Sequence, residues 1–367
     1  MSAIHSDNCR MITSRVELID PLQDQRWDDF VAHHPFGWLT HLSGWKKVLE
    51  ESFHHMKGCY LALSDGTGET IRAALPLYTV KSWLTGTRMV STPFATLSDP
   101  LIDSGRDLDE LHEAVSILSK RVGASYVEIR THLSSALVVD ADYGVQSFYK
   151  HHFIRLNPDH EKIMKTFHRS CVRQRIARAL NSGLTVRMGD CDADLDIFYT
   201  LHKATRRRHH LPPQPYRFIR SIWKTFAPSQ RVKLLLAYQN DQPIGGLILL
   251  QYKGRVSAEF SAMDETFKDV SPIHFLFWEA IKSACCDGYD VFDFGRTSPL
   301  NESLMKFKSH WGAELSDLPQ LYYPKQALEK FAPKESSAGS RIVKQLCRFA
   351  PDCTLEYIGE FCYQHLG

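Results

Sequence analysis

The sequence lacks a long apolar run. No segment reaches the roughly 18 residues that a membrane helix needs, and residues 1–11 contain no apolar core of signal-peptide length. Charge of either sign is not in large excess: the formal net charge is +2, which argues against a general nucleic-acid coat, although basic residues can still cluster. We therefore expect a protein of the cytoplasm.

Disulfide and metal-binding patterns are also missing. The nine cysteines are odd in number and form no pair of pairs, so we expect free thiols. Histidines occur as adjacent pairs whose side chains diverge on a helix or strand: His33-His34, His54-His55, His151-His152 and His209-His210. Because these pairs form no spaced ligand set, the sequence predicts no metal site.

A motif for covalent catalysis is absent too. The chain has no Gly-x-Ser-x-Gly, and none of its cysteines lies in a recognisable catalytic context. These absences exclude the familiar acyl-enzyme mechanisms. A reaction that joins two aligned substrates directly needs no such nucleophile.

The most informative segment of the chain lies between residues 289 and 312. Alternating apolar residues predict a strand up to Phe294, and Gly295 allows the backbone to turn out of the sheet. The pair Ser298-Pro299 predicts the start of a helix, through a capping hydroxyl and a preset φ angle.

This predicted helix has an apolar face and ends at Gly312. The residues of the face recur at helical spacing: Leu300, Leu304, Phe307 and Trp311. Lys306 and Lys308 point elsewhere, so we expect these lysines to be free to meet an anion.

An internal repeat indicates two domains, which a chain of 367 residues also favours. Each half contains a predicted hairpin, a helix, a glycine and a strand, with further helices before the hairpin. In order, these parts are 58–80, 108–122, Gly123 and 125–130 in the first half, and 232–252, 273–287, Gly288 and 289–294 in the second.

The C-terminal half resembles the Fem family. The shared signature is a strand ending in Asp293-Phe294-Gly295 and a helix that carries Phe307-Lys308 and closes at Trp311-Gly312. Fem proteins are aminoacyl-tRNA-dependent peptidyltransferases that build peptidoglycan cross-bridges, with relatives in exopolysaccharide and PEP-CTERM gene clusters. The resemblance is strongest to the exopolysaccharide-associated branch.

The resemblance implies an α/β (α+β) fold with tandem GNAT-like acyltransferase domains, each a mixed sheet flanked by helices. We expect an N-terminal domain at 1–157, a C-terminal domain with the active cleft at 158–325, and a linker with a helical tail at 326–367.

Basic residues concentrate in a predicted helix over 163–180. The resemblance implies that Arg169 and Arg173 lie near the phosphates of a nucleotide-linked acceptor or of the acyl carrier. A solvated basic helix is the alternative. Tyr216 follows a rigid, proline-rich loop, where it is a candidate wall or hydroxyl donor of the acceptor side, or a packed tyrosine.

The expected chemistry is aminolysis, in which an acceptor amine attacks an activated acyl ester or thioester. Glu259 and Asp293 lie on strands where a general base could act, although either carboxylate could instead form a structural hydrogen bond. The resemblance implies that Lys308, beside Phe307, meets the phosphate-rich end of the donor, with Arg296 in the same cleft.

The donor is constrained by a loop without glycine. Acetyl-CoA-dependent members of the GNAT fold wrap a pyrophosphate in a glycine-rich loop after the central strand, whereas residues 266–274 contain none. This favours an aminoacyl-tRNA or similar donor and an amino group of a cell-envelope or polysaccharide precursor as acceptor. The alternatives are an acyltransferase that uses acyl-CoA or acyl carrier protein in exopolysaccharide biosynthesis, and a non-catalytic scaffold. No permanently bound cofactor is expected.

The tail from Arg341 is predicted to be helical and amphipathic. Its apolar residues are spaced for one-sided burial: Ile342, Leu346, Phe349, Leu355, Ile358 and Phe361. Docking on the body of the protein is one interpretation. Contact with the anionic inner surface of the membrane is the other.

Overall fold

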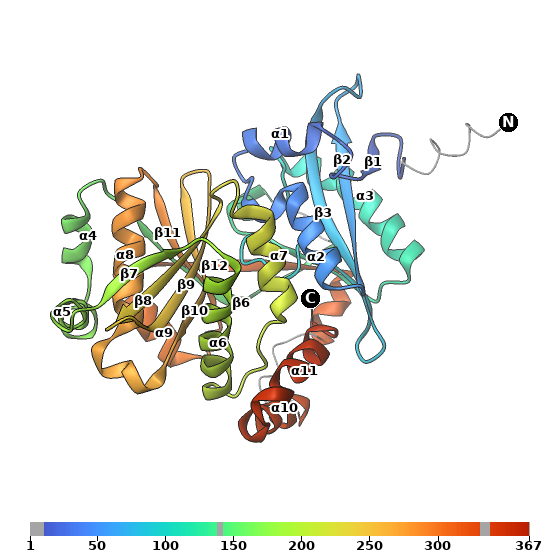
Figure 1. Cartoon of the computed structure of the whole chain (residues 1–367). Coiled ribbons are helices and arrows are strands. Elements are labelled where there is room, and N and C mark those ends of the chain that lie inside the picture. Colours follow the sequence, from blue (N-terminus) through green and yellow to red (C-terminus); the bar gives the residue numbers. More distant parts are fainter. Residues whose placement is uncertain (1–10, 138–141, 331–337, 367) are drawn as a thin grey trace. The chain divides into compact units, whose positions relative to one another are not determined.

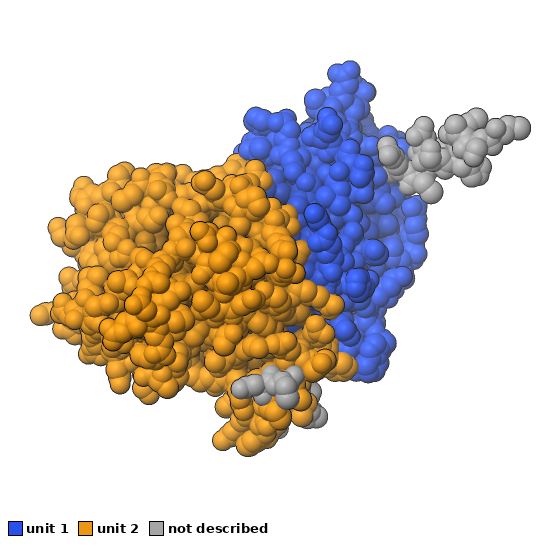
Figure 2. Space-filling model, in the orientation of Figure 1, with its two compact units in different colours: residues 1–148, 317–334, 363–367 blue, residues 149–316, 335–362 orange. Residues whose placement is uncertain are grey.

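The computed structural model describes residues 11–137, 142–330 and 338–366. The chain divides into two compact units, coloured separately in Figure 2: unit 1 comprises residues 1–148, 317–334 and 363–367, and unit 2 comprises 149–316 and 335–362. The divisions fall at 148 and 316, whereas 157 and 325 were expected. Strand β6 (Gly144–Arg155) pairs with a strand of unit 2, and strand β12 (Glu314–Tyr323) pairs with a strand of unit 1, so most of each strand falls in that unit.

Unit 1 is a mixed sheet flanked by helices (Figure 1). Its strands follow the order β1-β2-β3-β4-β5-β12, and only the β4–β5 pair is parallel among the described strands of this unit. Its main elements are β1 (Val16–Ile19), α1 (Arg26–His33), α2 (Ser43–Ser52), β2 (Met56–Ser64), β3 (Ile71–Ser82), β4 (Gly86–Ser91), α3 (Gly105–Val122), β5 (Val127–Arg130) and β12 (Glu314–Tyr323).

Unit 2 repeats this arrangement. Its sheet has the order β7-β8-β9-β10-β11-β6, and β10 and β11 form its parallel pair. Its main elements are β6 (Gly144–Arg155), α4 (His160–Thr166), the π-helical turn η3 (Arg169–Arg173), α5 (Gln174–Asn181), β7 (Thr185–Gly189), α6 (Asp192–Arg208), α7 (Tyr216–Phe226), β8 (Val232–Gln239), β9 (Gln242–Tyr252), β10 (Arg255–Met263), α8 (Pro272–Cys286), β11 (Val291–Thr297) and α9 (Glu302–Ser309).

The predicted repeat is confirmed in the order of the elements. The series β1-α1-α2-β2-β3-β4-α3-β5 of unit 1 corresponds to β7-α6-α7-β8-β9-β10-α8-β11 of unit 2. Gly123 and Gly288 follow the long helices with φ angles of 68° and 78°, a left-handed conformation that glycine adopts without a steric cost. The tandem GNAT-like fold expected from the sequence is thus the observed one.

The hydrophobic core of unit 2 holds strand β11 and helix α9 in place. Helix α8 packs on the sheet through aromatic residues, and the ring of Phe277 stacks on that of Phe294 at a centroid distance of 5.5 Å. Trp311, just after α9, is fully buried in the same cluster. These contacts fix β11 and α9 against each other.

The tail forms α10 (Ala338–Phe349) and α11 (Asp352–Tyr363). Its helical character is as predicted, but the expected burial of one apolar stripe is wrong. Leu355 is buried as predicted, but Leu346, Phe349 and Phe361 are 51%, 70% and 51% exposed, and α10 buries Cys347 instead. Within residues 11–137, 142–330 and 338–366, no helix combines the length and apolarity of a membrane span.

Candidate active site at the bulge of strand β11

Strand β11 does not end at Gly295, as the sequence predicted. Its register with β6 shifts between Asp293 and Gly295, and the strand continues to Thr297. Gly295 has a φ angle of 73°, which allows the chain to bulge and remain in the sheet. The bulge points the side chain of Asp293 and the carbonyl groups that follow it into one polar cluster.

Helix α9 also starts later than predicted. Its cap is Asn301, whose side chain accepts a hydrogen bond from Leu304 N at 3.2 Å, so Ser298-Pro299 lies before the helix. Leu300 is therefore outside the apolar stripe and is 64% exposed.

Asp293 is the centre of a buried ionic network. It is 1% exposed; one carboxylate oxygen lies 2.8 Å from His151 Nε2 and accepts from Gly295 N at 2.6 Å, and the other lies 2.9 Å from an Arg255 nitrogen. Burial alone would raise the pKa of Asp293, but His151, Arg255 and the Gly295 N–H outweigh it and lower the pKa. Asp293 is therefore ionised at neutral pH and braces the bulge.

Lys308 is buried rather than free at the surface, which corrects the expectation from the sequence. It is 6% exposed, and its ammonium group donates to the carbonyl oxygens of Gly295 and Arg296 at 3.0 and 3.2 Å. Desolvation lowers the pKa of Lys308 to about 8, against the opposing pull of Asp293 and Glu259. Lys306 is exposed, as predicted.

Glu259 completes the cluster from the adjacent strand β10. It is partly buried, and desolvation together with the nearby charge of Asp293 raises its pKa to about 7, although Arg296 and Lys308 act in the opposite direction. The site thus combines a carboxylate and an amine that both change protonation state near neutral pH.

Two histidines of β6 belong to this site and were missed from the sequence. His151 and His152 pair with Arg296 and Gly295 across the sheet, and both are buried. Burial and the charges of Lys308 and His151 lower the pKa of His152 to about 4. No local signal could have revealed them, because only the pairing of β6 with β11 brings them to the bulge.

Of the remaining predicted site residues, Arg296 adjoins the cluster, whereas Phe307 and Tyr216 make other contacts. Arg296 stacks over the ring of Tyr149 at 4.8 Å and interacts electrostatically with Glu259. Phe307 is a partly buried packing residue whose ring lies 5.6 Å from that of His274. Tyr216 begins α7 and donates its hydroxyl hydrogen to Asp196, so its contacts lie on the α6–α7 side.

Arg169 and Arg173 lie on η3, not on one continuous helix over 163–180. The chain breaks after α4 because His168 caps the next turn, its Nδ1 accepting from Cys171 N at 3.2 Å. Arg169 is exposed, whereas Arg173 is half-buried and its Nε has no hydrogen-bond partner among the described residues. The buried stripe of the following helix ends at Ala179, since Leu180 is 51% exposed.

Comparisons with known proteins agree with this architecture. Residues 166–309 match the acetyltransferase (GNAT) domain family. A UDP-N-acetylmuramoylpentapeptide-lysine N(6)-alanyltransferase from Weissella viridescens is 23% identical over 331 residues, covering 84% of this chain and 94% of the relative. The chain is a FemAB/FemX-like acyltransferase of the GNAT fold.

Solved structures show the same fold. The crystal structure of FemX superposes with a TM-score of 0.67 at 17% identity, covering 86% of this chain and 98% of that one. The structure of L-PGS from Bacillus licheniformis has a TM-score of 0.54 at 12% identity, with coverage of 89% and 97%. The FemX-like fold therefore extends over both units.

In this FemX-like chain, the segment after the central strand β10 uses backbone N–H groups in its own hydrogen bonds. Residues 265–270 form a 3-10 helix in which Asp264 accepts from Thr266 N and Phe267 N, and Ser271 N donates to Lys268 O. These N–H groups are already used within the segment, so they do not form a phosphate cradle of the acetyl-CoA type.

Proposed function

We propose that this protein transfers an aminoacyl or other acyl group from an activated carrier ester to an amino group of a cell-envelope precursor. The observation that carries the proposal is the cluster at the β11 bulge, where Glu259 and Lys308 have pKa values of about 7 and 8. Such values suit proton transfer and charge stabilisation at neutral pH.

The proposed reaction is direct aminolysis. The acceptor nitrogen attacks the ester carbonyl, the carbon–oxygen bond to the carrier breaks, and the amine proton passes to Glu259 and from there to the departing carrier hydroxyl. Lys308 donates two N–H bonds to backbone carbonyls, and an ammonium group has three, so its third is proposed to stabilise the oxyanion or a phosphate of the donor. Asp293 holds the bulge in place.

Arginines are proposed to bind the phosphates of the two substrates. Arg173, with its unsatisfied Nε, and Arg169 lie on η3, while Arg296 follows the bulge itself. The closed segment at 265–270 favours aminoacyl-tRNA over acyl-CoA as donor. By analogy with the named activity of the Weissella relative, we propose a muramoyl-peptide amine as acceptor, with a polysaccharide amine as the second candidate.

A transfer assay tests this function. Purified protein is incubated with radiolabelled alanyl-tRNA or acetyl-CoA and with a UDP-muramoyl-pentapeptide, an amino-sugar polysaccharide precursor or no acceptor. We expect label in the peptide from charged tRNA, and none from acetyl-CoA. Transfer from acetyl-CoA alone would support the alternative donor, and no transfer with any pair would contradict the proposal.

The tail is proposed to hold the protein at the inner surface of the membrane, where such acceptors reside. The exposed face of α10 carries Leu346 and Phe349 beside the exposed cations Lys344 and Arg348, and an apolar groove between α10 and α11 adjoins it. An apolar strip with basic flanks suits anionic lipid.

Flotation with vesicles checks the membrane contact. We expect the intact chain to float with phosphatidylglycerol-containing vesicles and less with neutral ones, and Leu346→Ser/Phe349→Ser to remain in the pellet. Tyr357→Ser, which removes another exposed aromatic residue of the tail, is the control and should float. Equal recovery of all variants would exclude this role.

A further inference from the structure

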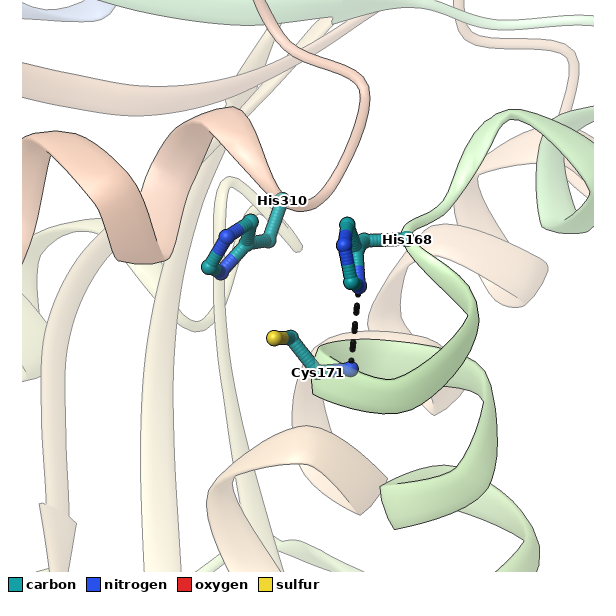
Figure 3. A group of neighbouring side chains, drawn as sticks. All are labelled: His168, Cys171 and His310. Carbon is teal, nitrogen blue, oxygen red and sulfur yellow. Dashed lines mark hydrogen bonds between the residues drawn. The ribbon is translucent and has the colours of Figure 1, made fainter.

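The turn η3 and the end of α9 bring three metal-ligand side chains together. His168, Cys171 and His310 each offer one ligand atom, and these atoms all lie within 4.8 Å of one another (Figure 3). Cys171 is a half-buried free thiol, His310 is half-buried and His168 is exposed. None of the three belongs to the polar cluster of the β11 bulge.

The backbone holds the two histidines next to each other. His168 N donates to His310 O at 2.8 Å, and the ring centroids lie 4.8 Å apart. The residues next to them in the chain also meet, since the ring centroids of Phe167 and Trp311 lie 5.1 Å apart. A Cβ added to Gly312 would lie 2.7 Å from Thr166 Oγ1, so only glycine permits this close approach of the two segments. The ligands therefore stand on a rigid support.

One local hydrogen bond must be exchanged when a metal binds. His168 Nδ1 accepts from Cys171 N, so the lone pair of this nitrogen is engaged and ligation would replace that bond. The Ser170 hydroxyl lies 3.9 Å from Cys171 Sγ, where it can donate to a thiolate. The π-helical turn also places Cys171 on the same side as His168, as Figure 3 shows.

We propose that His168, Cys171 and His310 bind a thiophilic divalent cation of the Zn²⁺ class. One thiolate and two imidazoles form a ligand set that Zn²⁺ prefers and Mg²⁺ or Ca²⁺ does not. A fourth position stays open to water, since His168 is exposed. The ion would link η3, which carries Arg169 and Arg173, to the end of the helix that carries Lys308, and this inference holds whatever the acyl donor is.

No metal site was predicted from the sequence, because the histidines stand out there only as adjacent pairs and form no spaced ligand set. The pattern His-x-x-Cys at 168–171 is weak alone, and its third partner lies far along the chain. A second cluster shows the contrast: Cys191 caps α6, and Asp194 accepts from both the N–H and the thiol of Cys191. Cys191 is an exposed free thiol outside the proposed site, so it is the matched control.

Cobalt binding tests the site directly. The full-length, chelator-treated protein is titrated with Co²⁺, and we expect one equivalent to produce a thiolate-to-cobalt absorption band that Zn²⁺ abolishes and Mg²⁺ does not. Cys171→Ser and His310→Gln should lose the band or weaken Co²⁺ binding by more than about 10-fold. Loss of an outer-shell partner alone costs about this much, and loss of a ligand should cost more. Cys191→Ser should keep it. No band in the parent protein, or an unchanged band in Cys171→Ser, would overturn the proposal.

Thermal unfolding separates metal binding from damage to the fold. Zn²⁺ should raise the Tm of the parent protein and of Cys191→Ser, because a ligand that binds only the folded state stabilises it. Without metal, Cys171→Ser should unfold near the parent Tm, and added Zn²⁺ should not shift it. An equal Zn²⁺ shift in Cys171→Ser and in the parent would show binding elsewhere and contradict the assignment.

Discussion

The strands β5 and β11 occupy equivalent places in the two units but differ in the buried charged groups around them. In unit 1, Glu128 and Arg130 on β5 form a buried ion pair at 2.9 Å, and Gln320 of the neighbouring strand donates to the same carboxylate oxygen at 2.9 Å. The carboxylate of Glu128 is thereby held by a guanidinium group and an amide group. The arrangement braces the sheet.

In unit 2, the equivalent brace is Asp293 with Arg255 and His151, but two further ionisable groups adjoin it. Glu259 and Lys308 both titrate close to neutral pH, for which desolvation is the first cause. One topology thus supports an ion pair in one unit and, in the other, a cluster with a carboxylate and an amine whose pKa values are shifted toward neutral pH by burial.

The largest effect is expected from Asp293→Asn, which removes the brace. Breaking a buried charge network typically costs about 3–5 kcal/mol, so the Tm should fall strongly. Since the partners of Asp293 lower its pKa, its stabilisation is present at neutral pH and is lost as the pH falls below about 4. Denaturant unfolding at pH 7 and at pH 3 should show the gap to the parent narrowing in acid. A constant gap would contradict the assignment.

The next effect concerns Lys308→Met, which keeps the apolar stem and removes the ammonium group. We expect transfer to fall by about 100-fold, as for the loss of one preorganised donor. Two carbonyl oxygens lose their donor as well, so unfolding should become easier by about 1–3 kcal/mol. Lys306→Met, at an exposed position of the same helix, is the control in both assays. Full activity in Lys308→Met would remove Lys308 from the mechanism.

The smallest effect is expected in the pH dependence of stability and activity, which should differ between a substitution in unit 2 and one in unit 1. The pKa of Glu259 is raised to about 7 in the folded protein, so folding favours its protonated form, and stability should decline as the pH rises from about 4.5 through 7. Glu259→Gln should remove this decline. Its free energy of unfolding, measured relative to that of the parent, should therefore be higher at pH 8 than at pH 5. If Glu259 is the general base, parent activity should rise near pH 7 as this carboxyl group ionises, and Glu259→Gln should lack that rise. Glu128→Gln in unit 1 should lower the Tm and leave that rise in activity in place.

The sequence was a good guide to elements with local signals. The two hairpins and the helices before Gly123 and Gly288 lie where alternation, helical spacing and C-terminal glycines indicated. The cap at Asn301 and the break at His168 were missed, because a continuous apolar stripe hides a change of helical turn.

The chemistry of the site was less predictable, since it depends on pairing across the sheet. Lys308 has the spacing of an exposed lysine, and only the carbonyl groups of the Gly295 bulge explain its burial. His151 enters the cluster because β6 pairs with β11. The roles of Arg169, Arg173 and Tyr216 stay predictions, as the structure gives their positions but not their ligands.

The pairing of β12 with β5 of unit 1 affects how the chain folds during its synthesis. Strand β5 pairs with β12 through residues 320–323, which leave the ribosome only after all of 149–316 has been synthesised. Until then the nascent first unit presents β5 as an open sheet edge, a template for wrong pairing. A fragment that stops at residue 148 keeps that edge permanently. The late strand therefore makes completion of the first unit depend on synthesis of the second.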